Sequence, residues 1–226
     1  MATIHTLPLG YVNSFLIQGA PGFILIDTGL TGTVKKLWKH LENLAIPPQD
    51  IKLIVITHGH QDHTGGLKAI KLRTGAEVLC HVDEAEFLRN GTNSDVVAHT
   101  WLLRKLISLA KEMSIEPVEP DILIKDEFPL VDYGIDGKVI HTPGHTAGSL
   151  SVIIEGKSAF VGDIAMRLPL VSRGSYHPVI GQDLGRVYQS WRDILDMGVE
   201  TIYTAHGKPF PAARLEKELA EYLNRL

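Results

Sequence analysis

The chain has 226 residues, and 22 lysines and arginines against 26 aspartates and glutamates give it a formal net charge of −4 at pH 7. With 44% hydrophobic and 21% charged residues it has the composition of a folded chain, and its charge balance argues against a nucleic-acid partner. No apolar run reaches the roughly 18–20 residues that cross a bilayer, no basic residue precedes Lys35 as in a secretory signal, and one cysteine fits the cytoplasm, where we expect the protein.

Short apolar runs alternate with amphipathic stretches in the first half of the chain. A Gly-Ala-Pro-Gly turn at residues 19–22 predicts a strand pair, and the β-branched run Ile51–Thr57 predicts a strand buried on both faces. Apolar residues three and four apart predict a helix over Thr31–Leu44. The expected elements are the strands Val12–Gln18 and Phe23–Ile26, the helix Thr31–Leu44, the strand Ile51–Thr57, the helix Leu67–Arg73 and the strand Glu77–His81.

Residues 90–120 interrupt this alternation. Apolar residues at helical spacing between Val97 and Met113 predict a helical elaboration around residues 90–120. The alternation then resumes with the strands Ile122–Lys125, Lys138–His141, Leu150–Glu155 and Ser158–Val161, the helix Val187–Met197, the strand Thr201–Ala205 and the helix Ala212–Leu226.

The two halves repeat one pattern of strand ends. In the first half a strand ends at Asp27, a helix follows, and the next strand ends at His58. In the second half a strand ends at Asp163, a helix follows, and the next strand ends at His206. The pattern predicts an α/β protein, a four-layer αβ/βα sandwich of two similar halves that forms a single domain over residues 1–226.

A dense cluster of metal-binding side chains follows the strand Ile51–Thr57. His58, His60, Asp62 and His63 lie within six residues, and imidazole nitrogens and carboxylate oxygens are good ligands for zinc, iron and manganese. His58 and His60 project to the same side of an extended chain, and a turn beginning near Gln61 could send Asp62 and His63 toward a second point, so one short loop could serve two metal ions. A closed structural zinc site usually contains cysteine, and this cluster contains none.

Three more donors occupy the same kind of position elsewhere. His145 follows the strand Lys138–His141, Asp163 follows the strand Ser158–Val161, and His206 ends the strand Thr201–Ala205. An α/β fold gathers its site at strand ends, so we expect these donors to meet the first cluster.

The pattern His58-x-His60-x-Asp62-His63, followed by His145, Asp163 and His206, resembles the metallo-β-lactamase fold superfamily of metal-dependent hydrolases. The resemblance implies one divalent ion held by His58, His60 and His145, a second held by Asp62, His63 and His206, and Asp163 bridging them. It also implies that Asp27 orients the ligand loop. Zinc is the first expectation for both ions, and the same ligands suit iron or manganese.

The expected function is that of a dinuclear metal-dependent hydrolase. A hydroxide shared by the two ions would attack a small ester-like substrate, a lactone, thioester or phosphodiester, and Asp62 would be the catalytic residue that relays a proton to the leaving group. The Thr57–His63 and Thr142–Ser149 motifs resemble glyoxalase II, although Ile164-Ala165-Met166-Arg167 replaces its Gly-Cys-Gly-Arg stretch. The alternative is a mononuclear iron-dependent oxidoreductase similar to persulfide dioxygenases.

A small-molecule substrate needs further contacts beside the metals. The irregular segment Met166–Gln182 lies just after Asp163, and long irregular segments beside catalytic residues often bind substrate. Arg173, Tyr176 and His177 are the candidate substrate-binding residues in it. Whether this segment or residues 90–120 form a lid is left open, as is the oligomeric state.

Overall fold

Two six-stranded sheets form the centre of the molecule, and the computed structural model describes them within residues 2–95, 97, 115–168, 172 and 174–224. The first sheet, in spatial order, contains β1 (Ile4–Pro8), β2 (Asn13–Gln18), β3 (Phe23–Ile26), β4 (Ile51–Val55), β5 (Glu77–His81) and β6 (Ile122–Ile124). The second contains β12 (Phe210–Pro211), β11 (Thr201–Tyr203), β10 (Ser158–Phe160), β9 (Leu150–Ile154), β8 (Gly137–His141) and β7 (Glu127–Pro129).

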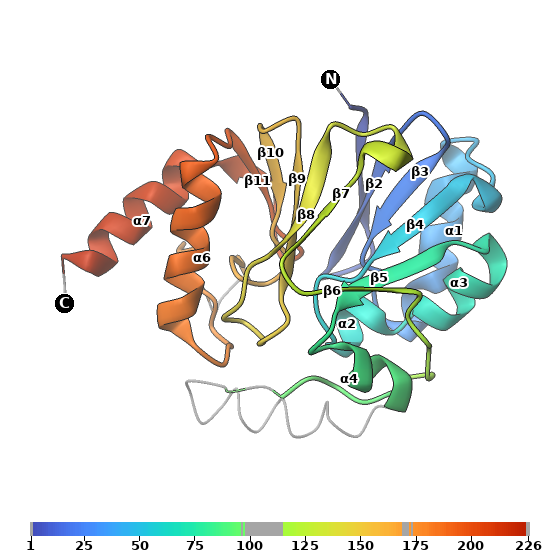
Figure 1. Ribbon diagram of the computed structural model, residues 1–226, viewed down its shortest axis with the longest axis horizontal. Helices are drawn as coiled ribbons and strands as arrows, with labels where there is room; N and C mark the ends of the chain where they lie inside the picture. The colour runs from blue at the N-terminus through green and yellow to red at the C-terminus, as the bar shows by residue number, and fades with distance from the viewer. Residues whose placement is uncertain (1, 96, 98–114, 169–171, 173, 225–226) are drawn as a thin grey trace.

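Helices cover the outer face of each sheet, and the two sheets face one another between them (Figure 1). The helices α1 and α3 lie outside the first sheet, α6 and α7 lie outside the second, and the short α2 and α4 lie at one end of the sandwich. Their bounds are Val34–Asn43 (α1), Gln61–Thr64 (α2), Leu67–Thr74 (α3), Ala85–Asn90 (α4), Leu184–Asp196 (α6) and Ala213–Leu223 (α7). Single 3-10 turns occur at Thr31–Thr33, Pro48–Asp50 and Val131–Tyr133.

The predicted repetition of the two halves is visible in the strand pairing. β3 runs parallel to β4 across the crossover helix α1, and β10 runs parallel to β11 across α6. In each half the first of these two strands also pairs antiparallel with the strand before it, β3 with β2 and β10 with β9. Equivalent strand ends of the two halves therefore reach the same end of the sandwich.

Three apolar cores separate the four layers. The central core, between the sheets, includes Phe15, Leu53, Val55 and Phe160, each at most 3% exposed. A second core packs the first sheet against α1 and α3, and a third packs the second sheet against α6 and α7. Strand β4 shows why both faces must be apolar, because Leu53 and Val55 enter the central core while Ile54 enters the outer one. The predicted four-layer sandwich is confirmed.

Several expected elements are correct in type and differ at their ends. The helix expected over Thr31–Leu44 begins as a 3-10 turn. The strand expected over Ile51–Thr57 ends at Val55, so Ile56 and Thr57 belong to the loop that carries the ligands. The short strands β1, β7 and β12 were not predicted, and neither were α2 and α4. Residues 96 and 98–114 of the expected helical elaboration lie outside the described residues. None of the described helices is both long and apolar enough to cross a membrane.

Candidate metal centre

Seven donor side chains converge at one end of the sandwich, although they come from four separate places in the chain. One cluster lies on the loop after β4 and on α2, and the others follow β8, β10 and β11. The donors are His58, His60, Asp62, His63, His145, Asp163 and His206. The structure thus brings together every donor that the sequence analysis named.

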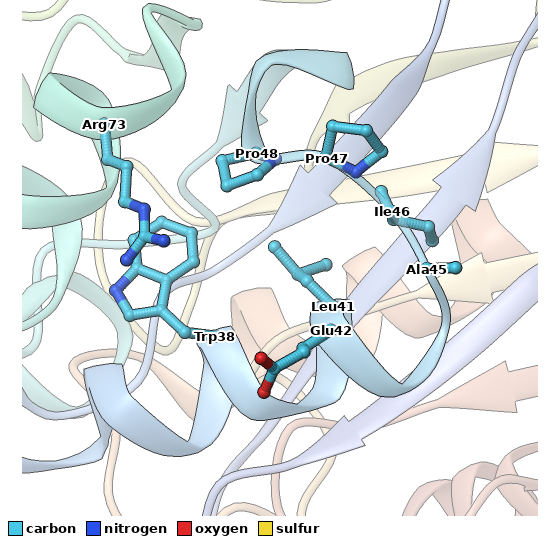
Figure 2. A pocket seen from close by; sticks show the side chains of 8 residues that line it. All are labelled: Trp38, Leu41, Glu42, Ala45, Ile46, Pro47, Pro48 and Arg73. Atoms are coloured by element: carbon cyan, nitrogen blue, oxygen red, sulfur yellow. The ribbon is translucent and has the colours of Figure 1, made fainter.

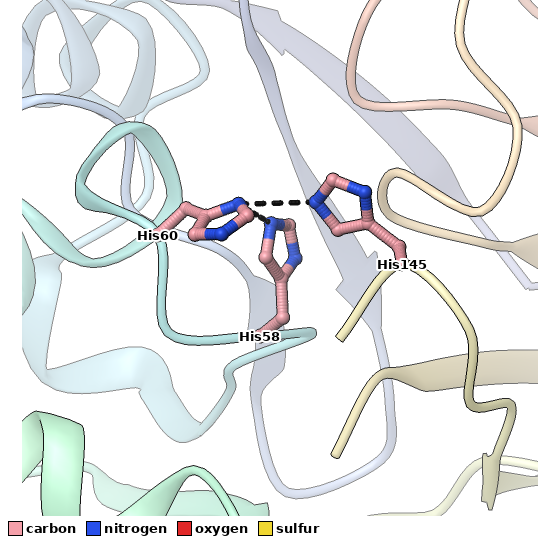
Figure 3. Close-up of side chains that lie close together, drawn as sticks. All are labelled: His58, His60 and His145. Carbon is pink, nitrogen blue, oxygen red and sulfur yellow. Dashed lines mark hydrogen bonds between the residues drawn. The ribbon is translucent and has the colours of Figure 1, made fainter. Parts of the chain in front are cut away.

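Three imidazoles form the first group (Figure 3). Nδ1 of His60 lies 2.9 Å from Nε2 of His58 and 3.0 Å from Nε2 of His145, and the three rings point toward one another from the two halves of the fold. All three side chains are buried. Three buried ring nitrogens directed at one point have the chemistry of a binding site for a cation.

The second group combines a carboxylate with two imidazoles. Nε2 of His206 lies 3.3 Å from Oδ2 of Asp62, and Nε2 of His63 lies 3.9 Å from Oδ1 of the same carboxylate. A ligand atom from each of the three residues lies within 4.8 Å of the others. Asp62 is the most exposed of the donors, with 18% of its side chain accessible, so the centre opens to solvent beside it.

Asp163 lies between the two groups. One of its carboxylate oxygens, Oδ2, is 3.7 Å from Nε2 of His145 and 3.3 Å from Nε2 of His206. The other, Oδ1, is 3.5 Å from Nε2 of His63. A single carboxylate therefore faces ring nitrogens of both groups, which is the position that a bridging ligand would need.

Unsatisfied polar atoms test whether this donor set fits metal ions. Nε2 of His60, Nε2 of His63 and Oδ1 of Asp163 are buried, and none of them has a hydrogen-bond partner among the described residues. Leaving a buried polar atom without a partner costs about 1–3 kcal/mol, more for a charged one. A divalent cation between His63 and Asp163 would satisfy Nε2 of His63 and Oδ1 of Asp163, which lie 3.5 Å apart, so the residues present fit a metal centre.

The pKa values of the histidines differ between the two groups. Burial, followed by the neighbouring imidazole of His145, lowers the pKa of His60 to about 3, and burial also lowers the pKa values of His58 and His145. These rings are neutral at pH 7, with lone pairs free to bind a metal. For His206, burial lowers the pKa but Asp163 and then Asp62 outweigh it and raise it to about 10.

The carboxylates show the complementary effect. Burial acts to raise the pKa of Asp62, but His63 and His206 outweigh it and lower this pKa to about 2. Burial likewise opposes ionisation of Asp163, yet His206 and His63 hold its pKa well below the ordinary range. The same carboxylates raise the pKa values of His63 and His206, so this half of the centre pairs two carboxylates with two protonated imidazoles, and a divalent ion that binds here would displace protons from the rings.

Asp27 contacts two residues of the ligand loop and of α2, Thr57 and His63. Its Oδ1 accepts a hydrogen bond of 2.8 Å from the backbone N–H of Thr57, and its Oδ2 accepts one of 2.8 Å from the Thr57 hydroxyl. The same Oδ2 lies 2.7 Å from Nδ1 of His63, which directs the Nε2 of this ring toward Asp163. Asp27 has φ of 57°, a left-handed conformation that aspartate tolerates better than most residues.

The sequence analysis did not identify two residues that lie beside the centre, Tyr11 and Glu84. The ring of Tyr11 stacks on that of His206 at 5.5 Å and 6°, and its backbone oxygen accepts a 2.9 Å hydrogen bond from Nδ1 of His206. Glu84, 1% exposed, contacts the backbone of the ligand loop at Gly59. The one available signal for Glu84 was a carboxylate shortly after a strand end, the position that the donors share.

The candidate substrate-binding residues have contacts away from the donors. Tyr176 is buried and stacks on Phe210 at 3.6 Å, while the ring of His177 stacks on Trp191 of α6 at 5.3 Å. Arg173 lies outside the described residues. A role of these three residues in substrate binding stays a prediction.

A separate hollow of about 560 Å³ lies on the outer side of the first sheet (Figure 2). It is bounded by α1, by the Pro47-Pro48 turn and by Arg73 of α3, whose guanidinium lies 4.5 Å from the centre of the Trp38 ring. No donor residue lines it. It is therefore distinct from the metal centre.

Comparisons with known proteins agree with this geometry. A family model described as the Metallo-beta-lactamase superfamily matches residues 7–206, a span that contains Asp27 and all seven donors. The acyl-coenzyme A thioesterase MBLAC2 of Gallus gallus is 29% identical over 228 residues, covering 94% of this chain and 78% of the relative. The hydroxyacylglutathione hydrolase GloC of Haemophilus influenzae is 25% identical over 193 residues, covering 81% of this chain and 82% of the relative. A metallo-beta-lactamase family protein from Thermus thermophilus shares the fold with a TM-score of 0.70 at 25% identity, covering 98% of this chain and 80% of that protein.

Proposed function

The chain belongs to the metallo-beta-lactamase superfamily and is a metal-dependent hydrolase, and from this premise we propose that it binds two divalent ions and cleaves a small thioester. The observation that carries the proposal is the placement of Asp163, whose carboxylate faces ring nitrogens of both donor groups. Two groups that share one carboxylate suit a pair of ions better than one.

Each ion would have its own set of protein ligands. His58, His60 and His145 would hold one ion, Asp62, His63 and His206 would hold the other, and Asp163 would contact both. Zinc suits these nitrogen and oxygen ligands best, and iron and manganese are the alternatives. When bound, such ions act as Lewis acids and lower the pKa of water from 15.7 to about 7, which supplies the nucleophile for hydrolysis at neutral pH.

Asp62 would transfer a proton to the leaving group. The carboxylate is ionised at pH 7, and one of its oxygens would take a proton from the attacking water and pass it to the leaving thiolate. Its 18% exposure makes it the donor that an entering substrate meets first. Because Tyr11 is 56% exposed beside His206, its ring would form one wall of the approach.

The substrate class rests on the two relatives. Acyl-coenzyme A and hydroxyacylglutathione, the substrates in their names, are both thioesters, and this chain covers more than three quarters of each relative. A thioester also needs little from the protein beyond the centre, because its thiolate leaves readily. Lactones and phosphodiesters are the other ester-like substrates to compare.

The experiment combines metal analysis with substrate hydrolysis on the same purified protein. Release of thiol from an acyl-coenzyme A and from an S-acylglutathione is measured beside hydrolysis of a lactone, a phosphodiester and a β-lactam. We expect thioester cleavage in wild type and its loss, together with bound metal, in His60→Ala and Asp62→Ala. His40→Ala is the control, because this histidine lies on α1 and contacts the carbonyl of Pro8 instead of the centre.

Two outcomes would contradict the proposal. Unchanged metal content in His60→Ala or Asp62→Ala would remove these residues from the ligand set. One iron per chain with consumption of oxygen in the presence of a persulfide would favour the iron-dependent oxidoreductase.

A further inference from the structure

We propose that Glu84 is a positioning residue that fixes the first ligand group, His58, His60 and His145, by tying together two loops from opposite halves of the fold. This inference rests on the proposed metal centre and assigns a role to a residue that forms no hydrogen bond with any of the seven donor side chains.

The carboxylate of Glu84 receives three hydrogen bonds. Its Oε2 accepts one of 2.7 Å from the backbone N–H of Gly59 and another from the hydroxyl of Ser94. Its Oε1 accepts one of 3.1 Å from the backbone N–H of Gly148. Glu84 is 1% exposed, and a buried carboxylate is tolerated only when such donors replace water.

Those backbone donors lie next to ligands of the first group. Gly59 is the residue between His58 and His60, and Gly148 lies three residues after His145. Gly59 belongs to the loop that follows β4 in the first sheet, whereas Gly148 belongs to the loop that joins β8 to β9 in the second. One carboxylate therefore sets the distance between the two loops that together supply these three imidazoles.

The local packing leaves little freedom for this link. A methyl group on Gly59 would lie 2.7 Å from Oε2 of Glu84, and one on Gly148 would lie 2.7 Å from its Cγ. Real Cβ atoms essentially never approach other atoms within 3.0 Å, so each loop depends on glycine to reach the carboxylate. Only glycine at both positions lets the two backbones close on one side chain.

The second ligand group has different supports. Nδ1 of His63 contacts Asp27 at 2.7 Å, and Nδ1 of His206 donates to the backbone oxygen of Tyr11 at 2.9 Å. Glu84 takes no part in either contact. Loss of the Glu84 link should consequently weaken the binding of one ion and leave the binding of the other unchanged. A general loss of stability would weaken the binding of both.

Glu84→Gln is the most direct test, because it keeps the size of the side chain. The amide NH2 must face one of the three donors, so at least one of these hydrogen bonds is lost. The control is Glu218→Gln on α7, where a carboxylate that is 4% exposed accepts hydrogen bonds from the Tyr176 backbone N–H and the Ser175 hydroxyl. Both substitutions neutralise a buried carboxylate that accepts hydrogen bonds from a backbone N–H and a serine hydroxyl, one beside the centre and one away from it, where Glu218 also pairs with Arg214 at 3.2 Å.

The measurement is a Zn²⁺ titration of each metal-free protein in competition with a chromophoric chelator, with circular dichroism to verify folding. In Glu84→Gln we expect one ion to bind about 10–100-fold more weakly, the range for losing a residue that orients ligands, and the other to bind within about twofold of wild type. In Glu218→Gln both ions should bind as in wild type. Adding Glu84→Gln to His60→Ala, which already lacks the first ion, should leave the affinity for the remaining ion unchanged.

A second variant keeps the test decisive if Glu84→Gln does not fold. Gly148→Ala leaves all charges in place but forces Glu84 to move, and it should weaken the same ion. Wild-type affinities for both ions in either folded variant would overturn the inference, and so would equal weakening in Glu84→Gln and Glu218→Gln. A wild-type chain that binds no Zn²⁺ would overturn the proposed function itself.

Discussion

Oδ2 of Asp27 lies 2.7 Å from Nδ1 of His63, and this contact joins the end of β3 to the helix that carries two of the seven donors. Both side chains are at most 2% exposed. The contact fixes which ring nitrogen of His63 faces the centre, because Nδ1 is engaged by the carboxylate and Nε2 is left for a metal ion.

Asp27→Asn is therefore expected to weaken the binding of the ion held by His63. An asparagine can still accept the Thr57 backbone N–H, but its NH2 group replaces the carboxylate oxygen that faces His63. Affinity for this ion should fall about 10–100-fold, which a competition titration measures. Asp132→Asn, at an exposed position, is the control. Equal affinities in wild type and Asp27→Asn would show that the contact does not orient the ligand.

Removing the metal should destabilise the folded chain. Each ion present at 100 times its dissociation constant adds about 2.7 kcal/mol of stability, so two ions add about 5.4 kcal/mol. Roughly 2–4 °C of Tm corresponds to each kcal/mol at this chain length, so EDTA should lower Tm by roughly 11–22 °C. Thermal unfolding followed by circular dichroism measures the shift. His60→Ala binds less metal and should show a smaller shift, and an equal shift in both proteins would contradict the assignment.

Tyr11→Ala is expected to impair turnover without loss of metal. The hydrogen bond that Nδ1 of His206 donates to the backbone oxygen of Tyr11 survives the substitution, whereas the exposed ring beside Asp62 is removed. We expect kcat/KM for a thioester to fall about tenfold, equivalent to about 1.4 kcal/mol, which is near the lower end for burying an aromatic side chain. Metal content by elemental analysis should match wild type, and loss of an ion would refute this division of roles.

Trp191→Ala should destabilise the second half of the sandwich. The side chain is fully buried between α6 and the second sheet, and its Nε1 donates a 2.8 Å hydrogen bond to the carbonyl of Ile164, the residue after Asp163. The free energy of unfolding in urea should fall by about 3–5 kcal/mol. Leu72→Ala, at a side chain that is 75% exposed, should stay within about 0.5 kcal/mol of wild type. Similar losses in the two variants would contradict the packing described for α6.

Features set by local sequence could be predicted. Apart from the exposed Lys52, strand β4 consists of apolar residues that are buried. His58, His60 and His63 follow it within a few residues, so their proximity needs no knowledge of the fold. His145, Asp163 and His206 could be added because each follows a strand, and strand ends of an α/β sandwich meet at one end.

Features set by long-range contacts could not be predicted. Nothing around Glu84 shows that it reaches Gly148, 64 residues away, or that Tyr11 stacks on His206. Strands as short as β12, which has only two residues, leave no periodic pattern and form because a neighbouring strand pairs with them. Tyr176 was a candidate for substrate binding because it lies in the irregular segment after Asp163. Its ring is buried and packs on Phe210, a contact that only the tertiary structure reveals.

The central claim is a pair of divalent ions that share Asp163 and support hydrolysis of a thioester. The most direct measurement titrates Zn²⁺ into the metal-free protein and follows thiol release at each ratio of metal to chain. We expect two ions to bind per chain, hydrolysis to appear only when ions are present, and Asp163→Ala to abolish both the second binding event and hydrolysis. Thioester hydrolysis that persists without metal, or a single binding event that Asp163→Ala leaves unchanged, would contradict it.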